Sequence, residues 1–385
     1  MQLPPWQTIS CANSNQVLHL AVPDASGRPS QPLALLTRTP LPDLPSFFLH
    51  FGNDRHSSVS CISIRKPVSM VHMPDLVAHS HIFTSCIFSD VFSKLYNAEI
   101  SKWPYFLVPI QMDVKISPDA EPLDLIAWEI LKSVFDYQNT YSSCRSSDDS
   151  WRTKPDDFFT DRFVTDSFDG SRKLWLSGIT HDYKPLDPVP DGCALRKGAR
   201  KSNKNILEYS NSMWKTSRSR LVDLDPEQRV YKAEVLPLRR NLLDEFNTPT
   251  NEESAPTKCY VTLQMLSISP LPTTVVAMAL AFPAIIHRME SYLIALEACE
   301  LLHLKISPAL ALEAMTKDSD NTDEHNPLVQ QINFQRGMGN NYERLEFLGD
   351  CFLKMAVSIS LYGMSFLSLL NSSLWVETSQ NMFPV

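Results

Sequence analysis

Three carboxylates near the end of the 385-residue chain have a spacing that could support metal chemistry. Glu343, Glu346 and Asp350 stand at i, i+3 and i+7, which places them on one face of a helix. Hard divalent ions prefer such oxygen ligands, and a pair of these ions can drive hydrolysis by an activated water. The alternative is a solvated acidic face on an amphipathic helix, because apolar residues fill the rest of the turn.

The order of residues around these carboxylates favours the metal site. Residues 343–350 have the sequence Glu-Arg-Leu-Glu-Phe-Leu-Gly-Asp, which resembles the signature helix of the ribonuclease III family at every position. The flanking residues 341–342 and 351–355 are similar to the first ribonuclease III domain of a fungal-type Dicer. The resemblance implies that Glu346 and Asp350 are catalytic ligands of Mg2+ or Mn2+, and that Glu343 has a structural role in the signature.

Length and composition set bounds on the protein class. The length allows two or three domains, and a net charge of −8 argues against a protein that coats nucleic acid nonspecifically. Eight cysteines without a Cys-x-x-Cys pair indicate a reducing compartment, and no signal peptide is evident, so we expect a cytoplasmic or nuclear, intracellular protein. The apolar stretch 266–286 contains three prolines and predicts a buried strand, turn and helix more readily than a membrane span.

One window of the chain is strongly basic. Residues 191–220 contain eight Lys or Arg against two acidic residues. Tyr209 and Trp214 lie within this window, on a short predicted helix over 205–214. Cations interleaved with aromatic rings suit single-stranded RNA, because charge holds phosphates while bases stack on the rings. A solvated basic loop over a core aromatic residue is an equally good interpretation from the residues alone.

The order of residues in this region resembles a divergent PAZ domain, the module that captures the 3′ overhang of an RNA duplex. This resemblance implies a set of residues for binding the RNA 3′ end: Tyr209, Trp214, Arg172, Lys173 and Tyr183. It also implies phosphate contacts from Arg196, Lys197, Arg200 and Lys201. Trp175, in contrast, is expected to be a core residue.

The predicted fold class is a multidomain α+β chain, with two β-rich units followed by helices. Residues 1–32 are expected to be a poorly ordered lead-in, 33–136 a platform-like domain and 137–160 a linker. Residues 161–258 are expected to be the PAZ-like domain, and 259–304 a connector strand and helix with Pro283 in the first helical turn. Residues 305–385 resemble part of a ribonuclease III domain, and the match ends near residue 362. In Dicers, which residues 33–136 resemble in this respect, the platform domain helps to seat the 5′ end of an RNA duplex.

The resemblance implies a Dicer-like endoribonuclease that processes double-stranded RNA into small RNAs for RNA silencing. The family also needs a further Asp and Glu at the metal site, and Glu377 is the only acidic residue after Asp350. We therefore expect this chain alone to be inactive. Expected partners are double-stranded RNA, Argonaute-pathway proteins and a second ribonuclease III domain. The alternatives are a non-catalytic module that binds duplex RNA ends, and a scaffold whose acidic helix is structural and which binds no RNA.

Overall fold

The computed structural model describes most of the chain and divides it into two compact units, Met1–His287 and Arg288–Val385. The described residues are 15–20, 29–38, 41–52, 55–66, 68, 74–92, 99–112, 114–141, 154–166, 173–193, 205–212, 224–236, 241–243, 258–264, 266–316 and 340–380. The mixture of helices and strands confirms the predicted α+β class.

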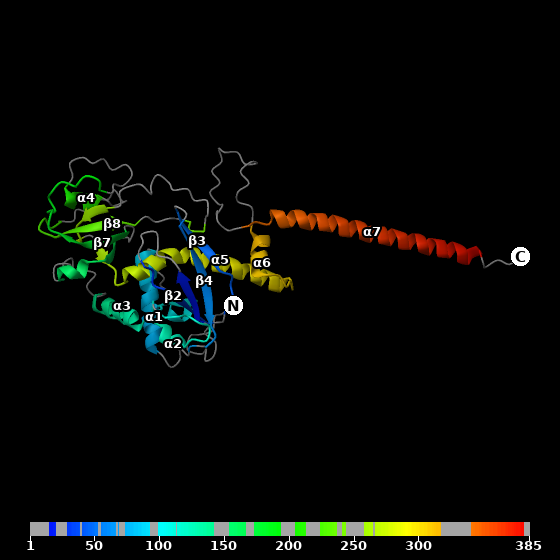
Figure 1. The fold of residues 1–385 in the computed structure, drawn as a ribbon, viewed down its shortest axis with the longest axis horizontal. Coiled ribbons are helices and arrows are strands. Elements are labelled where there is room, and N and C mark those ends of the chain that lie inside the picture. The colour runs from blue at the N-terminus through cyan, green and yellow to red at the C-terminus, as the bar shows by residue number, and fades with distance from the viewer. Residues whose placement is uncertain are drawn as a thin grey trace. The chain divides into compact units, whose positions relative to one another are not determined.

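The first unit begins with an antiparallel sheet of five strands, here called the first sheet, in the order β3-β4-β1-β2-β5 (Figure 1). Its strands are β1 (Asn15–Leu20), β2 (Leu33–Thr37), β3 (Phe47–Gly52), β4 (Arg55–Ile64) and β5 (Tyr105–Pro109). Alternation is clear in β3, where Phe47 and Leu49 are buried and Phe48 between them is exposed. β2 is buried from Leu33 to Leu36, as expected for a strand covered on both faces.

The central strand β1 lies in the segment expected to be a poorly ordered lead-in, so that prediction is wrong for residues 15–20. β1 pairs with β2 on one side and with β4 on the other. Its sequence, Asn-Gln-Val-Leu-His-Leu, does not alternate strictly between polar and apolar residues, because Val17 and Leu18 are adjacent. The strand forms because neighbouring strands on both sides supply hydrogen-bond partners for its backbone.

Helices of the first unit pack against the first sheet. α1 (Pro74–Cys86) continues into a π-helical turn, η2 (Ile87–Val91). α3 (Trp128–Tyr141) packs on α1 and β5. A 3-10 turn, η3 (Ile100–Lys102), precedes β5. The prediction of a linker over 137–160 is partly wrong, because residues 137–141 form the end of α3.

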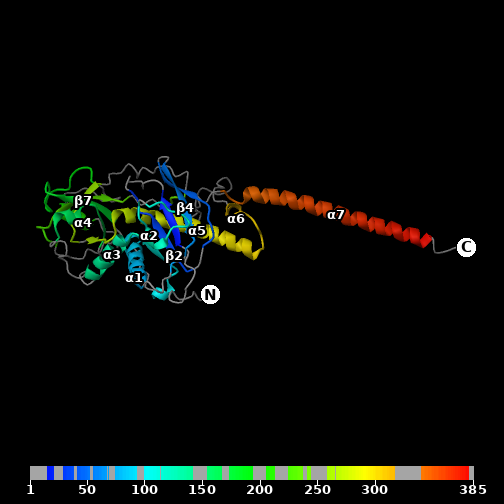
Figure 2. The same ribbon diagram turned by 60° about the horizontal axis from the view of Figure 1, so that its bottom comes forward.

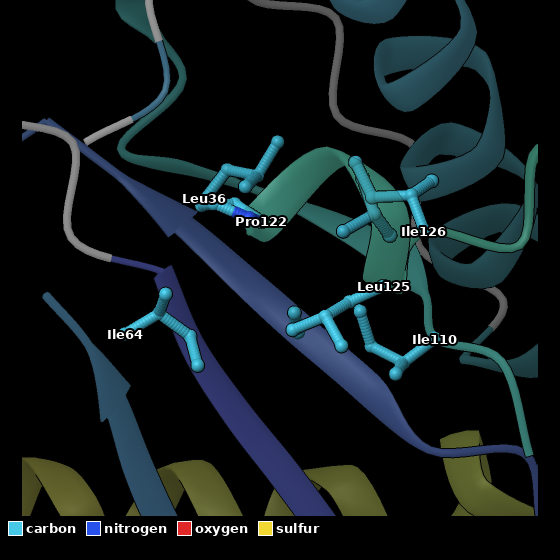
Figure 3. A pocket seen from close by; sticks show the side chains of 8 residues that line it. Leu36, Ile64, Ile110, Pro122, Leu125 and Ile126 are labelled. Carbon is cyan, nitrogen blue, oxygen red and sulfur yellow. The ribbon is translucent and has the colours of Figure 1, made fainter. Parts of the chain in front are cut away.

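A small pocket in the first unit lies between the sheet and the short helix α2 (Pro122–Leu125), as Figure 3 shows. Side chains of β2, β4, β5 and the α2 segment line it, among them Leu36, Ile64 and Ile126. All of its lining side chains are apolar, so the pocket offers no group that would bind a phosphate or a metal ion. It is part of the core of the first unit.

The second sheet of the first unit also has five strands, in the order β10-β6-β7-β8-β9. Its strands are β6 (Arg162–Asp166), β7 (Lys173–Thr180), β8 (Val230–Val235), β9 (Lys258–Val261) and β10 (Leu266–Ile268). A 3-10 turn, η5 (Asp156–Phe159), packs on β7, so the end of the predicted linker is also structured. Phe159 and Tyr231 meet in the core of this sheet at a ring-centroid distance of 5.0 Å. Trp175 is buried, which confirms its prediction as a core residue.

The long helix α5 (Thr273–Leu301) follows β10 after a short turn, which confirms the predicted strand, turn and helix. Its predicted start at Pro283 is wrong, because the helix begins at Thr273 and encloses that proline. The buried residues from Val275 to Ala279 form the first turns and anchor them in the core, which outweighs the local preference of proline for a helix start. The first half of α5 runs beside the first sheet in both Figure 1 and Figure 2. Phe282 of α5 contacts Tyr105 of β5, with 6.3 Å between the ring centroids.

The second unit contains the end of α5, α6 (Pro308–Met315) and α7 (Glu343–Gln380). The hydroxyl of Ser307 accepts a hydrogen bond from the backbone N–H of Leu310 and so caps the start of α6. By length and composition, two helices in the described part of the chain could cross a membrane, Thr273–Leu301 and Arg344–Ser365. The first of them is also a core helix of this protein, since 44% of its most apolar window is buried.

Candidate nucleic-acid interface

The second sheet presents an aromatic pair and a lysine on its outer face. Tyr260 of β9 lies directly opposite Lys232 of β8, so their side chains share one face of the sheet. Tyr183, from the loop after β7, meets Tyr260 at 4.9 Å between ring centroids in an edge-to-face arrangement. Both rings are half-buried and Lys232 is exposed, so ring surface and a cation are available side by side.

An acidic residue fixes the position of the lysine. The carboxylate of Asp182 lies 3.7 Å from the ammonium of Lys232 and accepts a hydrogen bond of 3.1 Å from the hydroxyl of Thr180. On its other side, Lys232 pairs with Gly178 at a β-bulge in β7. Gly178 has a φ of +141°, which favours glycine, and it places no side chain beside the lysine.

The loop that carries Tyr183 is held by α4 (Ile206–Ser212). Backbone N–H groups of Ile206 and Leu207 donate to the carbonyls of Asp187 and Pro185, at 3.0 and 2.9 Å. These bonds use donors that the first turn of a helix leaves without intrahelical partners. The aromatic pair therefore rests on a braced loop, although Tyr183 itself lies outside any helix or strand.

The electrostatics of the pair suit hydrogen bonding to an RNA backbone. Burial, and next the neighbouring phenol of Tyr183, raises the pKa of Tyr260 above its ordinary value of 10.0. Tyr260 therefore stays protonated at neutral pH, and its hydroxyl can donate to a phosphate or ribose oxygen. The rings supply stacking surface, and the ammonium of Lys232 supplies positive charge.

The structure separates the residues that the sequence proposed for the RNA 3′ end. Tyr183 lies in the interface, whereas Tyr209 is only 5% exposed and packs in the core of the second sheet. Lys173 is also buried, and its ammonium donates to the carbonyl of Asp90 at 3.1 Å. These positions favour structural roles for Tyr209 and Lys173, and RNA contact by either of them stays a prediction. The remaining proposed residues lie outside the described part of the chain: Trp214, Arg172, Arg196, Lys197, Arg200 and Lys201.

The sequence analysis missed Tyr260 and Lys232. Each alternates with buried neighbours, since Tyr231 and Ala233 flank the lysine while Cys259 and Val261 flank the tyrosine. This alternation could have placed both side chains on outward faces of their strands. It could not have shown that β8 and β9 pair or that Tyr183 contacts Tyr260.

The signature helix places its described carboxylates in solvent. Glu346 and Asp350 are exposed on α7, and Asp350 makes an ion pair of 2.5 Å with Lys354 one turn later. Among the described residues, no cluster of three or more His, Cys, Asp or Glu side chains could hold a metal ion. This part of α7 therefore offers two exposed carboxylates, and one of them is paired with a lysine. Two such ligands do not fit a closed site for Mg2+ or Mn2+.

The arginine of the signature has a clear structural partner. Arg344 donates to the carboxylate of Glu313 on α6, at 3.2 Å from one terminal nitrogen. The Glu313 side chain is only 10% exposed, whereas that of Arg344 is 67% exposed. A backbone bond of 3.0 Å from Tyr342 to Thr316 reinforces this contact. The start of α7 is therefore fastened to the end of α6.

Comparisons with known proteins agree with the predicted resemblance. Residues 148–267 match the family described as "Dicer-like protein 1, PAZ domain", a range wider at both ends than the predicted 161–258. The chain is 46% identical to the Dicer-like protein 1 of Chaetomium globosum over 353 residues. It is 44% identical to that of Neurospora crassa and 45% identical to that of Pyricularia oryzae. These matches cover 88–90% of this chain but 21% of each relative.

A solved Dicer structure from Giardia intestinalis also matches, with 15% identity and a TM-score of 0.42. This match covers 73% of the chain and 37% of the Giardia protein. A likeness of this strength supports no comparison of individual residues. The relation to fungal Dicer-like proteins rests instead on the sequence identities, which confirm the resemblance seen in the signature helix.

Proposed function

We propose that this chain, which is similar over nine-tenths of its length to a segment of fungal Dicer-like proteins, binds the ends of double-stranded RNA. The second sheet would hold the 3′ overhang, with its bases against the Tyr183–Tyr260 pair and a phosphate near Lys232. The first sheet would contact the strand that carries the 5′ end. In this proposal the chain takes part in processing duplex RNA for RNA silencing.

One observation carries this proposal: an aromatic pair and a lysine converge from three separate segments within the region that matches a PAZ domain. The rings accept any base, because stacking depends on a flat π face and not on base identity. The lysine adds an attraction to phosphate that weakens as salt concentration rises. Because the chain carries a net charge of −8, attraction to phosphate must come from local cations such as Lys232.

The test is a binding assay without metal, using a duplex RNA with a two-nucleotide 3′ overhang and the matching blunt duplex. We expect tighter binding of the overhang duplex. Tyr260→Ala removes one stacking ring, and we expect it to weaken binding of that duplex by roughly 1–3 kcal/mol. Tyr260→Phe keeps the ring and should retain most of the affinity.

A matched control is Phe48→Ala, which removes an exposed aromatic ring from the outer face of the first sheet. It should leave the preference for the overhang unchanged. Equal binding of the overhang and blunt duplexes by the unaltered protein would contradict the proposal. So would full binding by Tyr260→Ala.

The ribonuclease III activity of the lineage is a second part of the proposal. We infer that Glu346 and Asp350 belong to the catalytic centre of the complete enzyme, together with ligands and a second ribonuclease III domain outside the described residues. The two exposed carboxylates do not form a closed metal site, so we expect this chain to bind duplex RNA without cutting it. Incubation of the bound duplex with Mn2+ tests this expectation. Cleavage that is lost in Glu346→Gln would show that a complete catalytic site is present.

A further inference from the structure

Asp90 connects three segments of the first unit that are far apart in the sequence. It lies in the π-helical turn η2, which follows α1 on the first sheet. One carboxylate oxygen accepts from the hydroxyl of Ser269 at 2.7 Å, and the other accepts from Ser89 at 2.7 Å. Its backbone carbonyl accepts from the ammonium of Lys173 at 3.1 Å. Lys173 begins β7 of the second sheet, and Ser269 lies in the turn between β10 and α5.

The contact with Lys173 has a clear electrostatic basis. Asp90 lies in the last turn of a helix, where backbone carbonyls have no intrahelical partners and the helix dipole is negative. A lysine ammonium satisfies such a carbonyl and is attracted by the dipole. Lys173 is only 9% exposed, so its charge is largely removed from water and needs this partner.

Ser269 ties the same carboxylate to the start of the long helix. Its hydroxyl accepts from the backbone N–H of Leu271 at 3.2 Å, and its own N–H donates to the carbonyl of Phe163 in β6 at 2.9 Å. Two further bonds hold the first turn of α5. Thr273 donates to Asp161 at 2.8 Å, and the carbonyl of Thr274 accepts from Gln31 at 2.9 Å.

We propose that Asp90, Lys173 and Ser269, here called the Asp90 joint, are positioning residues that fix the first sheet, the second sheet and the start of α5 in one arrangement. This inference rests on the proposed function, in which each sheet contacts one strand of a duplex end. The joint would keep the two contacts at the separation that a duplex end requires.

The consequence is an advantage in binding both strands at once. When two sites are rigidly spaced, binding at one site raises the effective concentration of the ligand at the other. Loosening the joint would remove this advantage for a duplex. It would not affect a single strand, which occupies one site only.

The test compares two RNAs on one set of variants: a duplex with a two-nucleotide 3′ overhang, and the single strand that carries the same 3′ end. Asp90→Ala removes both carboxylate contacts, and Ser269→Ala removes the hydroxyl that donates to this carboxylate. We expect each variant to bind the duplex on the order of 10-fold more weakly, with single-strand affinity unchanged. Ser269→Thr keeps the hydroxyl and should retain most of the duplex affinity.

The control is Asp136→Ala, which removes an exposed carboxylate from α3 and should leave both affinities unchanged. If Asp90→Ala fails to fold, Ser269→Ala tests the same link through the loss of a single hydroxyl. Variants that keep full duplex affinity, or that lose duplex and single-strand affinity equally, would overturn the joint as a positioning device. If the unaltered protein binds neither RNA, the proposed function is wrong as well, which distinguishes the two failures.

Discussion

Thr84 joins α1 to the outer edge of the first sheet, and its hydroxyl offers a sharp test of the fold. The hydroxyl donates to the carbonyl of Ser80 at 2.6 Å and accepts from the backbone N–H of Leu107 at 2.9 Å. Leu107 is in β5, an edge strand that pairs with β2 on one side only. Backbone N–H groups along a strand point alternately to one side and the other. The N–H of Ile110 donates to Pro32 on the β2 side, so the N–H of Leu107, three residues earlier, points away from β2. The threonine therefore satisfies a buried donor that no strand can reach.

The expected cost follows from these contacts. Thr84→Val keeps the size and branching of the side chain but leaves the buried N–H of Leu107 without this acceptor. An unsatisfied buried donor costs about 1–3 kcal/mol of unfolding free energy. Thr84→Ser keeps the hydroxyl and loses one methyl group, which corresponds to about 0.8 kcal/mol. The isosteric valine should therefore be more destabilising than the smaller serine. If apolar volume alone decided stability, the serine variant would be the less stable of the two.

Urea unfolding followed by circular dichroism would give the two changes in unfolding free energy. Hydrogen exchange provides a local reading, because the amide of Leu107 should lose protection in Thr84→Val and keep it in Thr84→Ser. Equal stability of the two variants, or a valine variant more stable than the serine variant, would refute the assignment of Thr84 as the acceptor for β5.

Two further predictions concern ionisable groups. Glu313→Gln should destabilise the contact between α6 and α7. A double-mutant cycle with Arg344→Met should give a coupling free energy of about 1 kcal/mol, because one partner of the ion pair is largely exposed. A coupling near zero would contradict the contact. Burial lowers the pKa of His81 below 6.5, so the unfolded chain binds the proton more tightly than the folded one. The unfolding free energy should therefore fall as pH decreases below about 6.5, and His81→Gln should reduce that loss in urea unfolding series at several pH values. An unchanged pH dependence in this variant would exclude His81 as the source.

Much of the local structure was accessible from the sequence. The alternation of polar and apolar residues within β4 and the Ser-Pro pair at residues 307–308, where α6 begins, are both visible in the sequence. The spacing of Glu346 and Asp350 along one helix also follows from the sequence, because helical geometry alone sets it. In each of these cases the signal lies within a few consecutive residues.

Segments stabilised by distant partners were predicted less well. The sequence of β1 does not alternate strictly between polar and apolar residues, and the strand forms between β2 and β4. The start of α5 was placed too late, because proline is a strong local signal and the burial of Val275 and its neighbours is not visible in the sequence. Tertiary contacts outweighed local propensity in both cases.

The sequence by itself determined the family resemblance and the residue types available for RNA binding. Tertiary structure decided which of those residues share a surface. Tyr183 and Tyr260 lie far apart in the chain and meet only because β9 pairs with β8, while Lys173 turns inward to Asp90. Strand order and register depend on the free energy of the whole packed unit, so no short stretch of sequence contains them.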